Sequence, residues 1–134
     1  MGTHITHTLE TCLYAHDLAQ ASEFYTYVLG LREVSSMGTR GRVFRVNPQQ
    51  VLIIFDASQT KLPNELVPSH GTDGEGHAAF AIPPDQLEDW RKRLADHGVE
   101  IEREVGWETG ARSIYFRDPA GNSIELAAGE IWPA

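Results

Sequence analysis

The sequence predicts an α+β fold of two paired βαβββ modules that form a curved mixed sheet around a cavity. Short segments in which apolar and polar residues alternate indicate strands. One helical segment follows the first strand in each half, and the order of elements in the first half repeats in the second. We expect one domain, 1–134, with modules at about 7–56 and 75–128 and a linker at about 57–74.

The first module begins with an alternating segment, residues 8–15, which predicts a strand. Asp17 is a typical N-cap and Gly30 a typical helix stop, so the apolar residues spaced between them predict a helix over 18–29. Three predicted strands follow, at 31–36, 42–46 and 51–55. Asn47 and Pro48 begin a turn that makes the last two strands a hairpin.

The second module opens on Gly76–Ile82, another alternating segment. Pro84 or Asp85 then begins a helix that ends before Gly98. The remaining predicted strands are 99–105, 112–117 and 123–127. Asp118-Pro119-Ala120-Gly121 reads as a type I turn, since Asp, Pro and Gly suit its first, second and fourth positions.

The two modules repeat with nearly constant spacing. Asp17 to Gly30 and Asp85 to Gly98 are each thirteen residues apart. If the hairpins are superposed on their Asn-Pro and Asp-Pro turns, Arg42 matches Ser113 and Ile54 matches Glu125. The halves therefore share an architecture but differ in chemistry.

Glu125 stands in the middle of an otherwise apolar strand, where a carboxylate is costly to bury without a partner. The repeat puts Glu10 and His77 at equivalent first-strand positions on the expected concave face, with Glu125 on the last strand. This set suits Mn²⁺, Fe²⁺, Ni²⁺, Co²⁺ or Zn²⁺. Ile54, at the position that would supply a symmetric fourth ligand, leaves coordination positions open, which favours catalysis over a structural metal.

Other polar residues are expected to contact a substrate. Tyr115, on the same face as Ser113, is expected to orient or protonate a substrate oxygen or else to pack with a polar tip. Arg42 pairs with an anionic substrate group or lies at the sheet edge. Cys12 is expected to line the pocket beside Glu10. We assign Glu10 a catalytic role as well as a metal-binding one.

Composition narrows the class of protein. The net charge of −8, without a basic run, disfavours nucleic acid and anionic membranes as partners and leaves small molecules. Cys12 is the single cysteine and cannot form an internal disulfide, which fits the cytoplasm. The sequence contains no run of 18 apolar residues and no basic segment followed by an apolar one at its N-terminus, so we expect a soluble, cytoplasmic protein.

Three motifs in order resemble the vicinal oxygen chelate superfamily: Glu10–Leu31, Gly76–Ile82 and YFRDPAGNSIEL, residues 115–126. That superfamily holds glyoxalase I, extradiol dioxygenases, fosfomycin resistance proteins, methylmalonyl-CoA epimerase and bleomycin resistance proteins. The resemblance implies paired βαβββ modules, a homodimer and a divalent metal. His77 and Glu125 fall on the usual second-half ligands. The strand-one ligand is often His, so Glu10 disfavours an extradiol dioxygenase.

The resemblance leads to three functional hypotheses. The first is a metal-dependent enzyme of glyoxalase or dioxygenase type, a lyase, isomerase or dioxygenase, whose metal chelates vicinal oxygens of a small substrate and stabilises an oxyanion. The second is a metal-free protein that binds a drug or metabolite, as bleomycin resistance proteins do. The third is a fosfomycin-modifying enzyme. The sequence leaves open whether each site is completed within one chain or between two.

Overall fold

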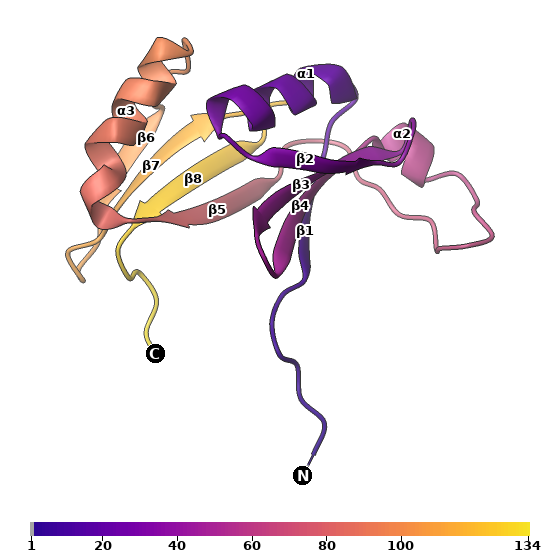
Figure 1. Ribbon diagram of the computed structural model, residues 1–134, viewed down its shortest axis with the longest axis horizontal. Helices are drawn as coiled ribbons and strands as arrows, with labels where there is room; N and C mark the ends of the chain where they lie inside the picture. Colours follow the sequence, from indigo (N-terminus) through magenta and orange to yellow (C-terminus); the bar gives the residue numbers. More distant parts are fainter. Residues whose placement is uncertain (1) are drawn as a thin grey trace.

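The computed structural model of the protein describes residues 2–134, and Figure 1 shows its two lobes. The first module contains β1 (Glu10–Tyr14), α1 (Leu18–Glu23), η1 (Phe24–Val28), β2 (Arg32–Ser36), β3 (Gly41–Asn47) and β4 (Gln50–Phe55). The second contains β5 (His77–Ile82), η2 (Pro84–Gln86), α3 (Leu87–Asp96), β6 (Arg103–Gly106), β7 (Arg112–Arg117) and β8 (Ser123–Ala128). A short helix, α2 (Ala57–Thr60), begins the segment between them.

Each module forms its own four-stranded mixed sheet, with the orders β1-β4-β3-β2 and β5-β8-β7-β6. In both sheets the first strand pairs in parallel with the last, and the other pairs are antiparallel. The predicted βαβββ fold class is therefore confirmed. Within residues 2–134 the eight strands are divided between two sheets, because β1 and β5 are edge strands that do not pair with each other.

The two modules share one hydrophobic core on the helix-facing side of the sheets. Phe24 of η1 lies 6.2 Å from Phe116 of β7, measured between ring centroids, so the first module's helix packs against the second module's sheet. The α3 residue Arg93 donates from Nε to the Val28 carbonyl at 2.7 Å and so satisfies an end of η1. Burial of apolar area from both halves favours a single folding unit.

The observed elements differ from the predicted ones in three places. The helix expected over 18–29 continues from α1 into the π-helical turn η1, which sequence spacing does not reveal. The strand expected over 99–105 is shortened to β6. The segment predicted as a linker, 57–74, includes α2, which Asp56 caps by accepting from the Ser58 amide at 3.0 Å.

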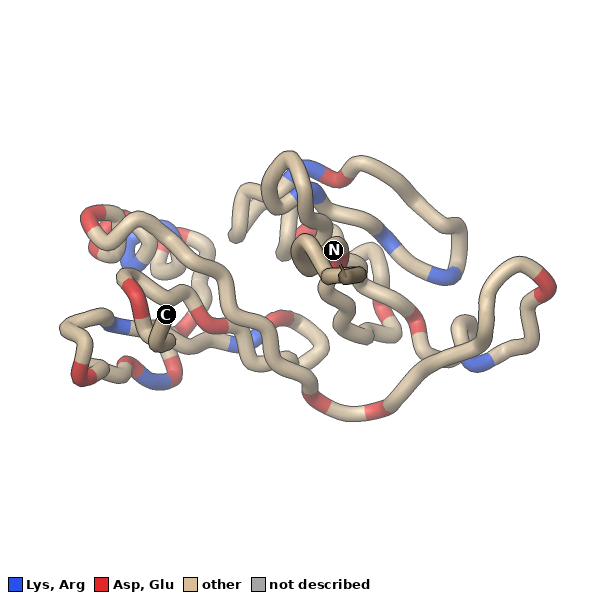
Figure 2. Tube along the Cα trace, turned by 90° about the horizontal axis from the view of Figure 1, so that it is seen from below, with Lys and Arg blue, Asp and Glu red and all other residues tan. Residues whose placement is uncertain are grey.

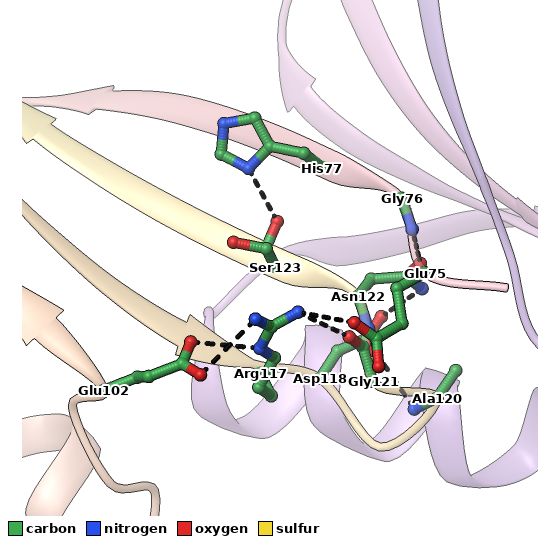
Figure 3. A network of polar contacts seen from close by, with 10 residues as sticks. All are labelled: Glu75, Gly76, His77, Glu102, Arg117, Asp118, Ala120, Gly121, Asn122 and Ser123. Atoms are coloured by element: carbon green, nitrogen blue, oxygen red, sulfur yellow. Dashed lines mark hydrogen bonds and ion pairs between the residues drawn. The ribbon is translucent and has the colours of Figure 1, made fainter.

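The predicted turn at Asp118 is confirmed by a hydrogen bond from the Gly121 amide to the Asp118 carbonyl at 3.0 Å. The Asp118 carboxylate is buried and also accepts from the amides of Ala120 and Asn122 (Figure 3). Tyr25 of η1 donates to it at 2.6 Å, so the turn also connects the two modules. Burial and then the Asp118 charge raise the pKa of Tyr25 far above its ordinary value.

The acidic and basic residues are interspersed along the trace in both lobes (Figure 2). Within residues 2–134, no helix has both the length and the apolar character needed to cross a bilayer.

Candidate functional site

His77 and Glu125 lie side by side on the face of the second sheet that the helices do not cover. His77 begins β5, and Glu125 lies in β8, which pairs with β5 in parallel. The His77 Nε2 and Glu125 Oε1 atoms are 3.3 Å apart. The side chain of Glu125 is only 6% exposed, whereas that of His77 is 51% exposed. A buried carboxylate thus faces an imidazole that solvent or a ligand can reach.

The other ring nitrogen of His77 fixes its tautomer. Nδ1 lies 3.0 Å from the Ser123 carbonyl oxygen, and Figure 3 draws this contact. Because a carbonyl only accepts, Nδ1 carries the proton. In the neutral ring, Nε2 then presents a lone pair to the carboxylate of Glu125. Two lone pairs at this distance repel, so the arrangement requires a shared proton or a metal cation.

A chain of two hydrogen bonds orients the other oxygen of Glu125. Ser113 of β7, fully buried, donates from Oγ to Glu125 Oε2 at 2.6 Å. Trp107 donates from Nε1 to Ser113 Oγ at 2.9 Å, and because an indole N–H only donates, the serine proton must point to the carboxylate. Ser113, which the sequence predicts to contact substrate, therefore donates its hydroxyl proton in a hydrogen bond to Glu125.

Tyr115 is the direct cross-strand partner of Glu125. Its ring stacks against that of His77, with centroids 6.3 Å apart and planes at 24°. Burial first, and then the charge of Glu125, raise the pKa of Tyr115, so the phenol keeps its proton at neutral pH. Tyr115 also lines a cavity of about 380 Å³ that extends toward β6.

Glu10 and Cys12 share the exposed face of β1 in the first sheet. Cys12 Sγ donates toward Glu10 Oε2 at 3.9 Å. Burial first, and then Glu10, raise the pKa of Cys12, so the thiol stays neutral. Over residues 2–134 no three His, Cys, Asp or Glu side chains gather closely enough to hold a metal ion. One chain therefore brings His77 and Glu125 together without Glu10.

The predicted position of Arg42 on the cavity face is wrong. Arg42 pairs with Ile54, which is fully buried in the core, whereas Ile53 is the residue that pairs with Cys12. Arg42 therefore lies on the helix-facing side, where its Nη1 is 3.4 Å from Glu33 Oε1. Five residues separate Arg45 from Val51 in one hairpin and Arg117 from Ser123 in the other, so the hairpins have equal lengths. Pro stands third among those five residues in the first hairpin and second in the other, so a match on the two prolines is off by one residue.

The register also corrects the position equivalent to Glu125. Glu125 pairs with Tyr115 on one side and with Ala79 on the other, two residues after His77. Ile53 pairs with Cys12, two residues after Glu10, and so it is Ile53 that occupies the equivalent place in the first sheet. The expectation that this place is apolar still holds, although the residue is not Ile54.

Two residues near the pair were not among the predicted site residues. Trp107 reaches Ser113 from the loop that follows β6, and no periodic pattern signals that contact. Arg103 of β6 is the cross-strand partner of Tyr115. Once β6 is known to pair with β7, the alternation of strand residues places Arg103 on the same face of the sheet as Tyr115 and Glu125.

The donor atoms present fit a divalent metal at His77 and Glu125. Two ligands each about 2.1 Å from one ion are separated by about 3.0 to 3.4 Å at bond angles of about 90° to 109°. The observed separation of 3.3 Å falls within that range. A carbonyl on Nδ1 and a hydroxyl on Oε2 are also the outer contacts that metal-binding His and carboxylate side chains usually have. Two donors are too few for a complete site.

A family model described as "Glyoxalase/Bleomycin resistance protein/Dioxygenase superfamily" matches residues 4–126. Among curated proteins, the chain is 30% identical over 128 residues to the glyoxalase domain-containing protein RDO1 of Mycosarcoma maydis, covering 92% of this chain and 67% of that protein. It is 39% identical over 61 residues to the metallothiol transferase FosB of Bacillus licheniformis, covering 45% of this chain and 40% of that protein.

Among solved structures, lactoylglutathione lyase from Agrobacterium tumefaciens superposes with a TM-score of 0.91 at 32% identity, covering 98% of this chain and 100% of the other. The fosfomycin resistance protein FosX from Listeria monocytogenes has a TM-score of 0.70 at 22% identity, covering 96% and 97%. At that identity the likeness to FosX concerns the fold alone.

Proposed function

Since the chain belongs to the glyoxalase/bleomycin resistance protein/dioxygenase superfamily, we propose that it is a divalent-metal-dependent enzyme acting on a small substrate with adjacent oxygen atoms. Its ligands would be His77, Glu125 and Glu10. The bound ion would act as a Lewis acid on the substrate oxygens. Members of this superfamily include lyases and dioxygenases, and a substrate screen would identify the reaction type.

The observation that carries the proposal is the pair His77–Glu125. Its tautomer, its separation of 3.3 Å and its buried carboxylate all suit a shared cation. In a purely structural pair, a single proton between His77 Nε2 and Glu125 Oε1 would suffice. The distinguishing measurement is therefore metal content.

Ser113, Tyr115 and Glu10 would orient the metal ligand, donate a proton and bind the metal or act as a base. Ser113 holds Glu125 in one orientation, which reduces the entropy lost when the carboxylate binds an ion. Tyr115, protonated at neutral pH, can donate a hydrogen bond or a proton to a substrate oxygen beside His77. Glu10, which is exposed, can act as a ligand or as a base toward the substrate.

We propose that Glu10 comes from a second copy of the chain, so that the enzyme is a homodimer with shared sites. Glu10 does not join His77 and Glu125 within one chain, in the range 2–134. The faces of β1 and β5 that carry these residues are exposed, and both strands lie at open sheet edges. An isologous dimer would form two such sites related by its two-fold axis.

Metal analysis tests the proposal. We expect protein dialysed against Mn²⁺, Fe²⁺, Ni²⁺, Co²⁺ or Zn²⁺ to keep one ion per chain for at least one of them and to release it to a chelator. Glu125→Gln and His77→Gln should abolish retention, whereas the control Glu108→Gln, an exposed change in the β6–β7 loop, should not. Absence of retention with all five metals would refute the enzyme and favour the metal-free binder.

A mixing experiment tests the shared site. Glu10→Ala and His77→Ala are each expected to lose metal binding. In a shared-site dimer, subunit exchange between the two variants restores about a quarter of the sites, because half of the dimers are mixed and each holds one intact site. Sites within one chain would restore none.

A fosfomycin-modifying transferase is a second candidate, and the specific observation in its favour is the 39% identity to FosB over 61 residues. Expression of the chain in a sensitive bacterium should then protect growth against fosfomycin, and protection should depend on Glu125. Lack of protection at full expression would remove this candidate and leave the metal proposal intact.

A further inference from the structure

The strongest unassigned feature is a row of side chains that runs across the second sheet from the His77–Glu125 pair to its edge. Register pairs Arg103 with Tyr115 and Tyr115 with Glu125, so all three side chains share one face. Arg103 is on β6, which is the edge strand, and its side chain is exposed. An arginine thus lies two strands from the candidate metal ligand.

The row borders the cavity of about 380 Å³, which is within the usual size of a small-molecule site. Arg103, Tyr115, Arg117 and Ser123 are among its lining residues. Tyr115 also stacks on His77, so the cavity ends at the ring beside the candidate metal ligands, which do not themselves line it. A ligand bound to the metal could extend along the sheet into this space.

The two arginines of the cavity differ in their charge balance. Arg117 is held by Glu102 and by Glu75, each at 3.0 Å, and Figure 3 shows it between them. Glu102 also lines the cavity, but its carboxylate is already engaged by Arg117. Among residues 2–134, Arg103 has no carboxylate within ion-pairing distance. Its charge is therefore available to a ligand.

We propose that Arg103 binds an anionic group of the substrate, a carboxylate, phosphonate or phosphate, carried on the same molecule as the metal-chelating oxygens. This proposal rests on the proposed function. Two strand spacings separate the Cα atoms of Arg103 and Glu125 by about 10 Å, so the anion must lie several bonds from the chelating oxygens. The substrate class is a small chelating acid.

Two probes of equal length isolate the anion. Hexanohydroxamic acid presents two adjacent oxygens to the metal, and adipic acid monohydroxamate adds a terminal carboxylate. On metal-loaded protein we expect wild type to bind the second about two- to fivefold more tightly, the upper range for an exposed ion pair. Arg103→Gln should remove that preference and leave the affinity for hexanohydroxamic acid unchanged.

The matched control is Arg112→Gln, which removes the same charge from the neighbouring strand β7. Arg112 pairs with Glu104 and lies next to Ser113 in the strand, so its side chain is on the opposite face of the sheet. The preference should survive in this variant. Loss of the preference in both variants, or its persistence in Arg103→Gln, would overturn the proposal in favour of a general field effect or another anion contact.

A second measurement separates this proposal from the metal site. Adipate is titrated into metal-free protein while the NMR signals of the arginine Nε groups are followed. We expect the Arg103 signal to shift in the millimolar range and the Arg112 signal to stay in place. If no metal is retained but Arg103 still responds, the proposed enzyme fails and the anion site stands. If Arg103 does not respond in either experiment, the anion site fails.

Discussion

Ser113→Ala should weaken metal binding without unfolding the protein. The substitution removes the hydroxyl that donates to Glu125 Oε2 at 2.6 Å and leaves a space the size of one oxygen atom. Loss of an outer contact of this kind typically reduces metal affinity about 10- to 100-fold, which is about 1.4 to 2.7 kcal/mol. We expect a change in that range, because Glu125 is nearly fully buried and water cannot easily replace the hydroxyl.

The assay is a competition titration with a chromophoric chelator, which gives the metal Kd of each variant. Urea unfolding of the metal-free proteins, measured beside it, separates metal affinity from folding. Trp107→Phe keeps an aromatic ring but removes the N–H that polarises Ser113, so a smaller loss of about two- to fivefold is expected. Thr109→Ala is the control, because its hydroxyl accepts from the Ala111 amide and does not lead to Glu125.

The result that would refute this reasoning is a metal Kd for Ser113→Ala within twofold of wild type while Glu125→Gln abolishes binding. Glu125 would then bind the ion without help from its hydrogen-bonding neighbour. An equal loss in Thr109→Ala would instead assign the effect to a disturbed β6–β7 loop.

The contacts between modules give two further predictions. The raised pKa of Tyr25 means that its stabilisation is present below the ordinary tyrosine pKa of about 10 and is lost as pH rises above it, by up to about 1.4 kcal/mol per pH unit. Urea unfolding between pH 8 and 11.5 should show the full loss in wild type and in Tyr27→Phe, whose ring is 65% exposed. The loss should be smaller in Tyr25→Phe, where only the raised pKa values of groups such as Tyr115 and Cys12 still contribute. Asn122→Ala removes the side chain that accepts from the Gly76 amide at 2.7 Å and donates to Asp118 at 2.9 Å. It should lower the free energy of unfolding by about 2 to 5 kcal/mol. A loss as small as that of the control Asn64→Ala, in the exposed loop, would contradict this prediction.

Local patterns predicted most of the fold because strands such as β1, β5 and β7 alternate and the helices that follow β1 and β5 have a recognisable start or stop. For the turn at Asp118, local sequence predicts the turn type but not its burial. Its type follows from Asp118, Pro119 and Gly121. Its burial beneath Tyr25 depends on a residue 93 positions away and has no local signal.

The errors in the site arose from register. Superposing the two hairpins on their prolines assumed that Pro has the same place in both turns, but Pro48 stands one position later in its turn than Pro119. A shift of one residue moves a side chain to the opposite face, and so Arg42 was placed on the wrong side. Residues in the second sheet, where the pairing is regular, were placed on the expected face.

The corrected register explains why a single chain holds an incomplete set of donors. At equivalent positions the second sheet has Glu125 and Tyr115, where the first has Ile53 and Val43. The first sheet thus keeps one donor, Glu10, with apolar neighbours. If all three donors bind one ion, Glu10 must approach from a sheet that faces the second one. Within residues 2–134 the two sheets of one chain do not bring Glu10 there, which is why we propose that a second copy supplies it.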